Sequence, residues 1–255
     1  MITIATWNVN SIRSRLDHLK LWLDKNNIDI LCLQETKVQD ADFPTQVFSE
    51  IGFQAEFTGQ KSYNGVCTLF NNRAKLFCKE LKGINDEQKR LIAIAKDNSL
   101  FVNIYVPNGS SVGSEKFHYK LKWLDGFCNW ITERCMEFEN IFLLGDFNIA
   151  PDDLDVHDPD EWKDKILCTR VEREYIHKLK SIGFIDLFRY TNKKLKAFSW
   201  WDYRAASFRR NRGLRIDLIL AYSKNQLSYD CWIDPDPRGW EKPSDHTPVL
   251  ASIEF

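Results

Sequence analysis

The sequence predicts an α/β protein in which stacked sheets are covered by helices, in one domain spanning residues 1–255. Apolar strand-like runs outnumber helical patterns, the two kinds of segment mix along the whole chain, and no Pro-, Gly- or Ser-rich linker divides it. The 255 residues are 44% hydrophobic, which is enough for one large core or two small ones.

Eight apolar runs predict the strands. The first two are residues 3–9, TIATWNV, and residues 28–35, IDILCLQE. The second run is unbroken, which is typical of a strand that is buried on both faces. The other six runs are 65–72, 90–97, 100–107, 140–147, 214–223 and 247–255. The last run alternates apolar and polar positions, as a half-buried strand does, with Val249, Ala251, Ile253 and Phe255 on one face.

Helical spacing predicts four helices between these strands. Residues 14–27 place Leu16, Leu19 and Leu23 on one face. The segment 171–183, VEREYIHKLKSIG, ends in Gly183, a typical C-cap. The other two predicted helices cover residues 114–138 and 42–50.

Composition excludes several classes of protein. The seven cysteines are odd in number and form no C-x-x-C pair, which argues against a disulfide framework and against a zinc site. The N-terminus MITIATWNVN lacks the features of a signal peptide. No apolar stretch approaches the roughly 20 residues that a membrane helix needs. These features predict a cytoplasmic protein with no membrane partner.

The formal net charge of −1 hides a strong local asymmetry. Residues 193–215 carry eight Lys or Arg against one acid, whereas residues 152–164 carry seven acids against one Lys. Local charge governs binding to a polyanion more than the sum over the chain does, so a nucleic-acid partner is compatible with this sequence.

Seven polar residues stand at the margins of the predicted strands: Asn8, Glu35, Asp146, Asn148, Asp217, Asp245 and His246. Taken singly, most of them fit a turn, a helix cap or a solvated strand end. Asp217 differs, because it lies within the apolar run LRIDLIL and a buried carboxylate needs a partner. We expect His246 to be that partner.

Together these side chains point to one chemistry. Carboxylates, carboxamides and water are the ligands that suit Mg²⁺, and a bound Mg²⁺ stabilises charge on a phosphate. An Asp and an Asn can align a water, and a histidine held by a buried aspartate can donate to a phosphoryl oxygen. The set therefore predicts metal-assisted hydrolysis of a phosphodiester.

Seven motifs, in order along the chain, resemble those of the exonuclease III family of apurinic/apyrimidinic (AP) endonucleases. They are WNVNSIRSR, LCLQETK, YVPNG, LLGDFNIAP, FSWWDYR, NRGLRIDLIL and KPSDHTPV. The resemblance extends over nearly the whole chain. It implies a four-layered α/β sandwich like that of deoxyribonuclease I, with two facing, mostly antiparallel sheets flanked by helices.

The resemblance also implies roles for individual residues. The implied catalytic residues are Tyr105, Asp146, Asn148, Asp217 and His246. The implied metal site draws on Asn8, Glu35, Asp146, Asn148, Asp245 and His246, with Glu35 as the principal ligand of Mg²⁺ and with Mn²⁺ as a substitute. The implied DNA contacts are Arg90, Asn108, Trp200, Arg212, Leu214, Arg215 and Ile216. Among these, Trp200, Leu214 and Ile216 would line a pocket for a baseless sugar.

The implied function is that of a monomeric DNA-repair nuclease which acts on double-stranded DNA with abasic sites or blocked 3′ ends. Two alternatives remain at this point. One is a phosphoesterase that acts on a lipid headgroup or a small phosphate ester, and the other is a DNA-binding protein on this fold without catalysis. The basic and aromatic residues of 193–215 favour a duplex. The acidic segment 152–168 matches no family motif, and we expect its His157 to be a solvated loop residue.

Overall fold

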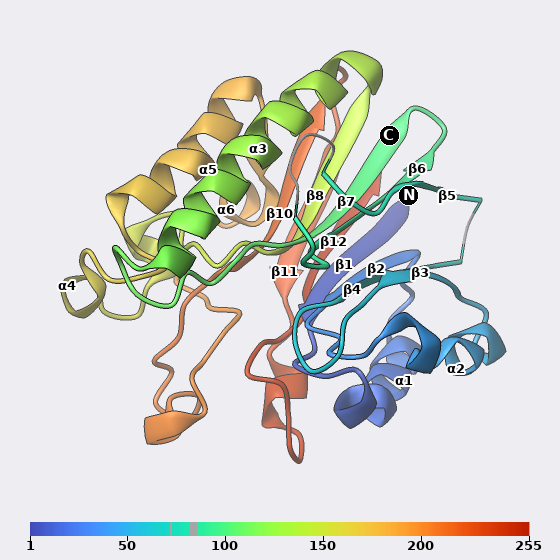
Figure 1. Cartoon of the computed structure of the whole chain (residues 1–255), viewed down its shortest axis with the longest axis horizontal. Helices are drawn as coiled ribbons and strands as arrows, with labels where there is room; N and C mark the ends of the chain where they lie inside the picture. The colour runs from blue at the N-terminus through green and yellow to red at the C-terminus, as the bar shows by residue number, and fades with distance from the viewer. Residues whose placement is uncertain (72, 82–85, 255) are drawn as a thin grey trace.

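Two sheets face each other in the computed structural model, which describes residues 1–71, 73–81 and 86–254. Within these residues twelve strands form two six-stranded sheets, and helices lie on the outer face of each sheet (Figure 1). Helix, sheet, sheet and helix thus make four layers, which confirms the α/β sandwich that the sequence predicts.

The strand order defines both sheets. The first sheet runs β11 (Ser228–Ile233), β12 (Val249–Glu254), β1 (Ile2–Asn8), β2 (Ile30–Gln34), β4 (Val66–Phe70) and β3 (Gln54–Thr58). The second runs β5 (Lys75–Cys78), β6 (Leu91–Lys96), β7 (Ser99–Tyr105), β8 (Asn140–Asp146), β10 (Asp217–Ser223) and β9 (Ile185–Asp186). Of the pairings described, β1–β2 and β7–β8 are parallel and the others are antiparallel.

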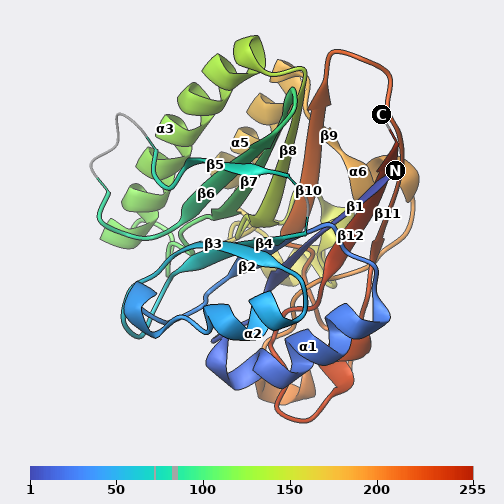
Figure 2. The same ribbon diagram turned by 90° about the vertical axis from the view of Figure 1, so that its right-hand side faces the viewer.

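The helices divide between the two outer faces. Helices α1 (Leu16–Lys25) and α2 (Thr45–Glu50) cover the first sheet, and α3 (Glu115–Glu137) and α5 (Arg170–Ile182) cover the second (Figure 2). Two shorter helices, α4 (Pro159–Trp162) and α6 (Leu187–Thr191), lie in the connections, together with the 3₁₀ turns η1 (Arg13–Arg15), η2 (Asp40–Asp42), η3 (Asp153–Asp155), η4 (Arg204–Ala206) and η5 (Asp236–Gly239). Among the described residues, none of the helices combines the length and the apolar character that a membrane span requires.

Burial on both faces explains the unbroken apolar strands. In β8, Phe142 and Leu144 belong to the core between the two sheets, whereas Leu143 belongs to the core beneath α3 and α5. Successive side chains of a strand point to opposite faces, so a strand with a core on each side needs apolar residues throughout. Cys32 of β2 is likewise wholly buried between the sheets, as expected for a core residue.

Individual residues explain where α5 begins and ends and how the end of β8 packs against β7. Helix α5 begins at a capping box in which Thr169 and Glu172 exchange hydrogen bonds, and it ends at Gly183, whose φ is +118°. In β8, a Cβ on Gly145 would lie 1.9 Å from the carbonyl oxygen of Ile104, so only glycine lets β8 approach β7 there. Gly145 directly precedes Asp146.

The prediction from sequence omits four strands and begins another too early. The strands β3, β5, β9 and β11 are absent from the prediction, because they are short or carry polar residues on one exposed face. The predicted strand 214–223 begins only at Asp217, since Leu214 instead forms isolated bridges to Val156 and Trp200. Two predicted strand residues, Asn72 and Phe255, lie outside the described part of the chain.

Candidate active site

Strands of both sheets bring the predicted polar residues to one end of the sandwich. Asn8 ends β1 and Glu35 follows β2, which runs parallel to β1. In the second sheet, Asp146 at the end of β8 pairs in register with Asp217 at the start of antiparallel β10. His246 lies just before β12, which pairs with β1. Residues far apart in sequence therefore meet where the strands end.

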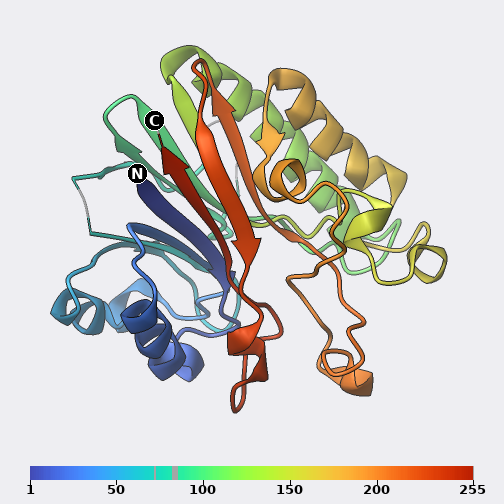
Figure 3. The same ribbon diagram turned by 180° about the vertical axis from the view of Figure 1, so that it is seen from behind.

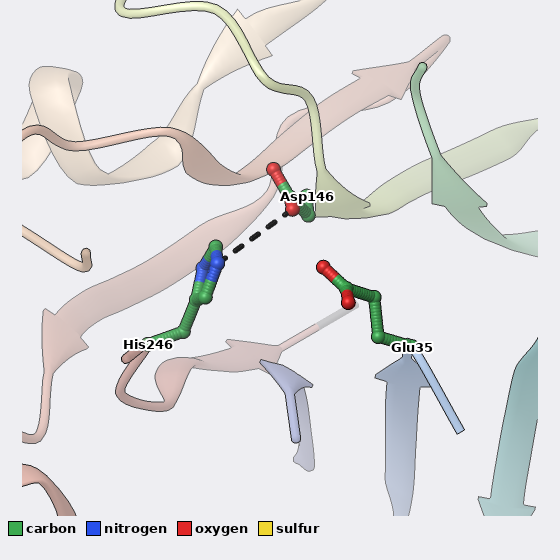
Figure 4. A group of neighbouring side chains, drawn as sticks. All are labelled: Glu35, Asp146 and His246. Carbon is green, nitrogen blue, oxygen red and sulfur yellow. Dashed lines mark ion pairs between the residues drawn. The ribbon is translucent and has the colours of Figure 1, made fainter. Parts of the chain in front are cut away.

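Three side chains converge at this end: Glu35, Asp146 and His246 (Figure 4). Each offers one ligand atom, and these atoms all lie within 4.8 Å of one another. The amide of Asn8 bridges the two acids, since its Nδ2 lies 2.9 Å from Glu35 Oε1 and 2.9 Å from Asp146 Oδ2. The group is the only such cluster found among the described residues.

The donor chemistry of this cluster fits a divalent cation. Asp146 is 1% exposed, and burial raises its pKa to about 7 against the opposing charge of His246. Two carboxylates in so small a space suit a hard cation that takes oxygen ligands, and the NH2 group of Asn8 holds the two carboxylates together. Glu35 and Asp146, with Asn8 beside them, are the residues that would hold it.

A buried aspartate holds the imidazole of His246. Its Nδ1 lies 2.8 Å from Asp217 Oδ2, and its Nε2 lies 3.8 Å from Asp146 Oδ2. Burial works to lower the pKa of His246, but the carboxylates of Asp217 and Asp146 outweigh it and raise that pKa to about 10. The ring is therefore a fixed, positively charged donor at neutral pH, and the predicted Asp217–His246 pairing is confirmed.

Two residues that the sequence reading missed fix this pair. Ser199 donates through Oγ to Asp217 Oδ2 at 2.6 Å and accepts the backbone N–H groups of Ile216 and Asp217. Trp7 donates from Nε1 to the carbonyl oxygen of His246 at 3.2 Å. Neither carries a sequence signal of its own, because serine and tryptophan at strand margins are common in structural roles.

A lysine beside Glu35 was missed as well. The Nζ of Lys37 lies 2.8 Å from Glu35 Oε2 and also donates to Asn10 Oδ1. Although burial works to raise the pKa of Glu35, the charge of Lys37 and the amide of Asn8 hold it below its ordinary value. The sequence feature that could have indicated this contact is the position of Lys37 in LQETK, two residues after the predicted metal ligand.

The amides of Asn108 and Asn148 form a second group beside Asp146. The backbone N–H of Asn148 donates to Asp146 Oδ1 at 2.9 Å, and Nδ2 of Asn108 donates to Asn148 Oδ1 at 2.9 Å. Asn148 has φ +48°, a left-handed conformation that turns the chain sharply after the strand. The motif GDFN thus places its aspartate and asparagine on one small surface.

Tyr105 and Arg90 pack together at the edge of the cluster. The guanidinium of Arg90 lies 4.7 Å from the ring centroid of Tyr105, and it donates to the carbonyl oxygen of Tyr105 and to Gln88. Both side chains line a groove of about 580 Å³, together with Asn108 and Lys116. Burial, with the negative charges of Glu35 and Asp146, raises the pKa of Tyr105 well above its ordinary value, so its hydroxyl stays protonated.

Asp245 is not one of the three residues of the cluster. Its Oδ1 accepts from Asn10 Nδ2 at 2.9 Å, and its Oδ2 accepts from Trp200 Nε1 at 3.0 Å. It therefore ties Trp200 to the segment that follows β1, and its part in metal binding stays a prediction.

The structure corrects the predictions for Arg215 and His157. Arg215 is wholly buried, with Nε 2.7 Å from Asp155 Oδ1 and Nη2 2.6 Å from Asp186 Oδ2, so the prediction that it contacts DNA is wrong. His157 is not a solvated loop residue, because its ring contacts the carbonyl oxygen of Gly213 and accepts from Arg212 Nε. The acidic segment is thus anchored against the residues that precede β10.

The predicted sugar pocket is closed in this structure. Leu214 is 0% exposed and Ile216 is 1% exposed, and Trp162 and Trp200 pack against the cluster that contains them. The rings of the two tryptophans meet edge to face at 6.4 Å. A sugar could reach Leu214 or Ile216 only after neighbouring side chains move. Arg212 keeps partial exposure beside them, at 33% of its side chain.

Two facing sheets thus end in a carboxylate–imidazole cluster, with a buried Asp–His pair behind it. A sequence model of the endonuclease/exonuclease/phosphatase family matches residues 5–246, and the chain belongs to this family. This confirms the resemblance seen in the motifs.

Individual relatives match over the full length. The chain is 33% identical to a Haemophilus influenzae protein named exodeoxyribonuclease III, and the match covers 98% of each chain. The structure of the present chain superimposes on the 3′ phosphatase NExo from Neisseria bound to a product DNA hairpin with a TM-score of 0.95, at 36% identity and full coverage of both chains. An AP endonuclease from Archaeoglobus fulgidus gives a TM-score of 0.93 at 35% identity, also with full coverage.

Proposed function

We propose that this protein is a base-excision-repair nuclease that hydrolyses phosphate esters in double-stranded DNA with the help of Mg²⁺. It cleaves the phosphodiester 5′ to an abasic site and leaves a 3′-hydroxyl, and it acts from 3′ ends as a 3′→5′ exonuclease and a 3′-phosphatase or phosphodiesterase. The observation that carries the proposal is the convergence of Glu35, Asp146 and His246. The names of its relatives, exodeoxyribonuclease III, 3′ phosphatase and AP endonuclease, support it.

Glu35 and Asp146, with Asn8 bridging them, are the residues we assign to the cation. When bound there, Mg²⁺ would supply positive charge to the phosphate oxygens as a Lewis acid. Mn²⁺ has the same preference for oxygen ligands and is the expected substitute.

His246 is assigned to the phosphate rather than to the cation. Its Nδ1 is engaged by Asp217, and the two neighbouring aspartates favour the protonated ring, which has no lone pair for a metal. The Nε2–H is then free to donate to a phosphoryl oxygen as negative charge develops there. Because Ser199 and Asp217 hold the ring in place, little reorganisation is needed at the moment of reaction.

Asp146 and Asn148 are assigned to the attacking water. Asp146 is largely ionised at pH 8, because its pKa is raised only to about 7, and so it can accept a proton from water. The side chain of Asn148 is held by Asn108 and by the carbonyl oxygen of Val106, so its amide has a fixed orientation. The hydroxyl of Tyr105 adds a further donor at the phosphate.

Two surfaces beside the cluster suit a duplex. The groove lined by Arg90 and Lys116 adjoins Tyr105 and can receive a DNA strand next to the reacting phosphate. A long loop that includes η4 projects beyond the end of the sandwich where the cluster lies (Figure 3). This loop belongs to the basic segment 193–215, which would contact the phosphate backbone without reading sequence.

The buried state of Leu214 and Ile216 favours a second candidate, which is an enzyme that processes 3′ ends and does not incise abasic sites. In this candidate Trp162 and Trp200 stay closed over the pocket, and a baseless sugar finds no space. Phosphate ester hydrolysis at a 3′ terminus needs only the cluster of Glu35, Asp146 and His246 and the groove beside it. The two candidates therefore share a mechanism and differ in substrate.

Two labelled duplexes separate these possibilities. One carries a single tetrahydrofuran abasic analogue and a 5′ label, and the other carries a 3′-phosphate at a nick. Each is incubated with the protein in Mg²⁺ and in EDTA. Mg²⁺-dependent cutting directly 5′ of the analogue, with removal of the 3′-phosphate, supports the full proposal. Removal of the phosphate alone supports the second candidate. Activity on neither duplex, with hydrolysis of a phosphoinositide or a small phosphate ester, contradicts both.

A further inference from the structure

A fully buried ion pair lies behind the active-site loops, between residues that have no role in the mechanism above. Lys120 projects from α3 and Glu172 from the first turn of α5, and the side chains of both are 0% exposed. A buried pair of this kind is weak evidence for a stability role, because apolar residues of similar volume often serve as well. Its contacts indicate a different purpose.

The ammonium of Lys120 joins two active-site loops. Its Nζ donates to the carbonyl oxygen of Asn148 at 2.7 Å, to that of Asn108 at 3.3 Å, and to the carboxylate of Glu172. These three acceptors match the three N–H donors that a lysine carries. Asn108 and Asn148 are the two residues whose side-chain amides meet beside Asp146.

Glu172 anchors the pair from the other side. Its carboxylate also accepts the backbone N–H groups of Leu167 and Thr169, both at 3.1 Å, and the hydroxyl of Thr169 at 2.7 Å. The carboxylate is thus fixed by the start of α5, and it fixes the ammonium in turn. The position of the two loops is therefore set by the rigid helices α3 and α5.

The loop that carries Asn148 needs such support because its backbone is unusual. Asn148 has φ +48°, whereas the φ of +91° next to Asn108 belongs to Gly109, which adopts it freely. A non-glycine residue in this region is unfavourable unless surrounding contacts hold it. An ammonium that binds both carbonyl oxygens fixes the orientation of both peptide planes, and through them the direction of the two side-chain amides.

We propose that Lys120 is a positioning residue, which aligns the amides of Asn108 and Asn148 through their carbonyl oxygens, with Glu172 as its buried counter-charge. The inference rests on the proposed function, since Asn148 is assigned there to the attacking water and its amide is held there by Asn108. Lys120 itself does not touch the substrate.

The test removes both charges together, in the variant Lys120→Met/Glu172→Gln. The glutamine keeps one oxygen, which can accept the N–H and the hydroxyl of Thr169 but not also the N–H of Leu167, and no buried charge is left unpaired. On a duplex with a 3′-phosphate we expect kcat to fall about 10- to 100-fold, as small misplacements in an active site do, with KM for the duplex unchanged within about twofold.

The matched control is Arg170→Met/Glu174→Gln, which removes an exposed ion pair from the same helix. Its side chains are 89% and 58% exposed, so both the melting temperature and kcat should match those of the wild type. Wild-type kcat and KM in Lys120→Met/Glu172→Gln would overturn the inference. If that variant does not fold, Lys120→Met alone replaces it, because it removes the contacts to both carbonyl oxygens, and a wild-type kcat there overturns the inference equally.

A double-mutant cycle separates positioning from loss of stability. If Lys120 acts through Asn148, then Asn148→Ala lowers kcat much less in the Lys120→Met/Glu172→Gln background than in the wild type. Equal losses in both backgrounds would show that the ion pair acts independently of the amide and would refute the inference. A wild-type protein that does not hydrolyse DNA would instead contradict the proposed function, which distinguishes the two failures.

Discussion

Replacing Asp217 by Asn removes the negative charge that faces Nδ1 of His246 at 2.8 Å while preserving the shape of the side chain. The pKa of His246 is raised from 6.5 to about 10, since the carboxylates of Asp217 and Asp146 outweigh the effect of burial. A hydrogen bond to a charged group is worth about 1.5–3 kcal/mol, or roughly one to two pKa units. We therefore expect Asp217→Asn to lower the pKa of His246 by about one to two units.

Two changes in activity follow from this loss. The protonated ring is the form that donates to the phosphate, so a lower pKa moves the alkaline limb of the pH–kcat profile down by about one to two units. At pH 8, kcat should fall about 10- to 100-fold, because each ~1.4 kcal/mol lost from the transition state lowers the rate about tenfold.

The assay is initial-rate hydrolysis of a 3′-phosphorylated duplex between pH 6 and pH 10. The matched control is Asp230→Asn, which changes an exposed aspartate of the edge strand β11 and should leave kcat and the profile unchanged. An Asp217→Asn variant with kcat within twofold of wild type and an unshifted alkaline limb would refute the role of the Asp217–His246 pair.

Three further predictions concern other parts of the molecule. Glu35→Gln should raise the Mg²⁺ concentration for half-maximal activity at least about tenfold, as a metal titration of the initial rate would measure; an unchanged midpoint would remove Glu35 from the metal site. Trp200→Ala should weaken incision at an abasic analogue more than it weakens duplex binding, and equal losses would contradict its place at a sugar pocket. Arg215→Met should lower the free energy of unfolding by about 3–5 kcal/mol in urea, because Asp186 loses its buried counter-charge and Asp155 keeps only Arg189. A loss below about 1 kcal/mol would show that Arg215 is dispensable for stability.

The central strands of the fold could be predicted because their burial on both faces leaves a clear signal. The run containing Phe142, Leu143 and Leu144 is apolar throughout since cores lie on both sides of β8. The edge strands could not be found in the same way. In β11, for example, Asp230 and Trp232 face outward, and its pattern resembles a polar loop.

The residues of the site were predictable because chemistry restricts them to few residue types. A carboxylate within an apolar run, such as Asp217, requires a partner, and His246 is the partner found in the structure. Glu35 and Asp146 stand at strand ends, where side chains from different strands can meet. The resemblance of the motifs to those of the exonuclease III family implied the role of each residue.

Residues that act through long-range contacts could not be predicted. Arg215 looks like a DNA-binding residue in a basic segment, yet its partners Asp155 and Asp186 lie 60 and 29 residues away. Lys120 occupies one position of a long amphipathic helix, and only the tertiary structure brings it to the carbonyl oxygens of Asn108 and Asn148. Contacts of this kind depend on how the layers pack, which local patterns do not encode.

Release of phosphate from a 3′-phosphorylated duplex, followed in a single turnover as Mg²⁺ is raised from an EDTA-treated baseline, tests the central claim most directly. The wild type and Asp146→Asn are compared at equal occupancy of DNA. The wild type should release phosphate only when Mg²⁺ is present, and Asp146→Asn should bind the duplex with similar affinity while releasing none. Release by the wild type in EDTA, or equal rates for the two proteins, would contradict the assignment of this cluster as the site of phosphate ester hydrolysis.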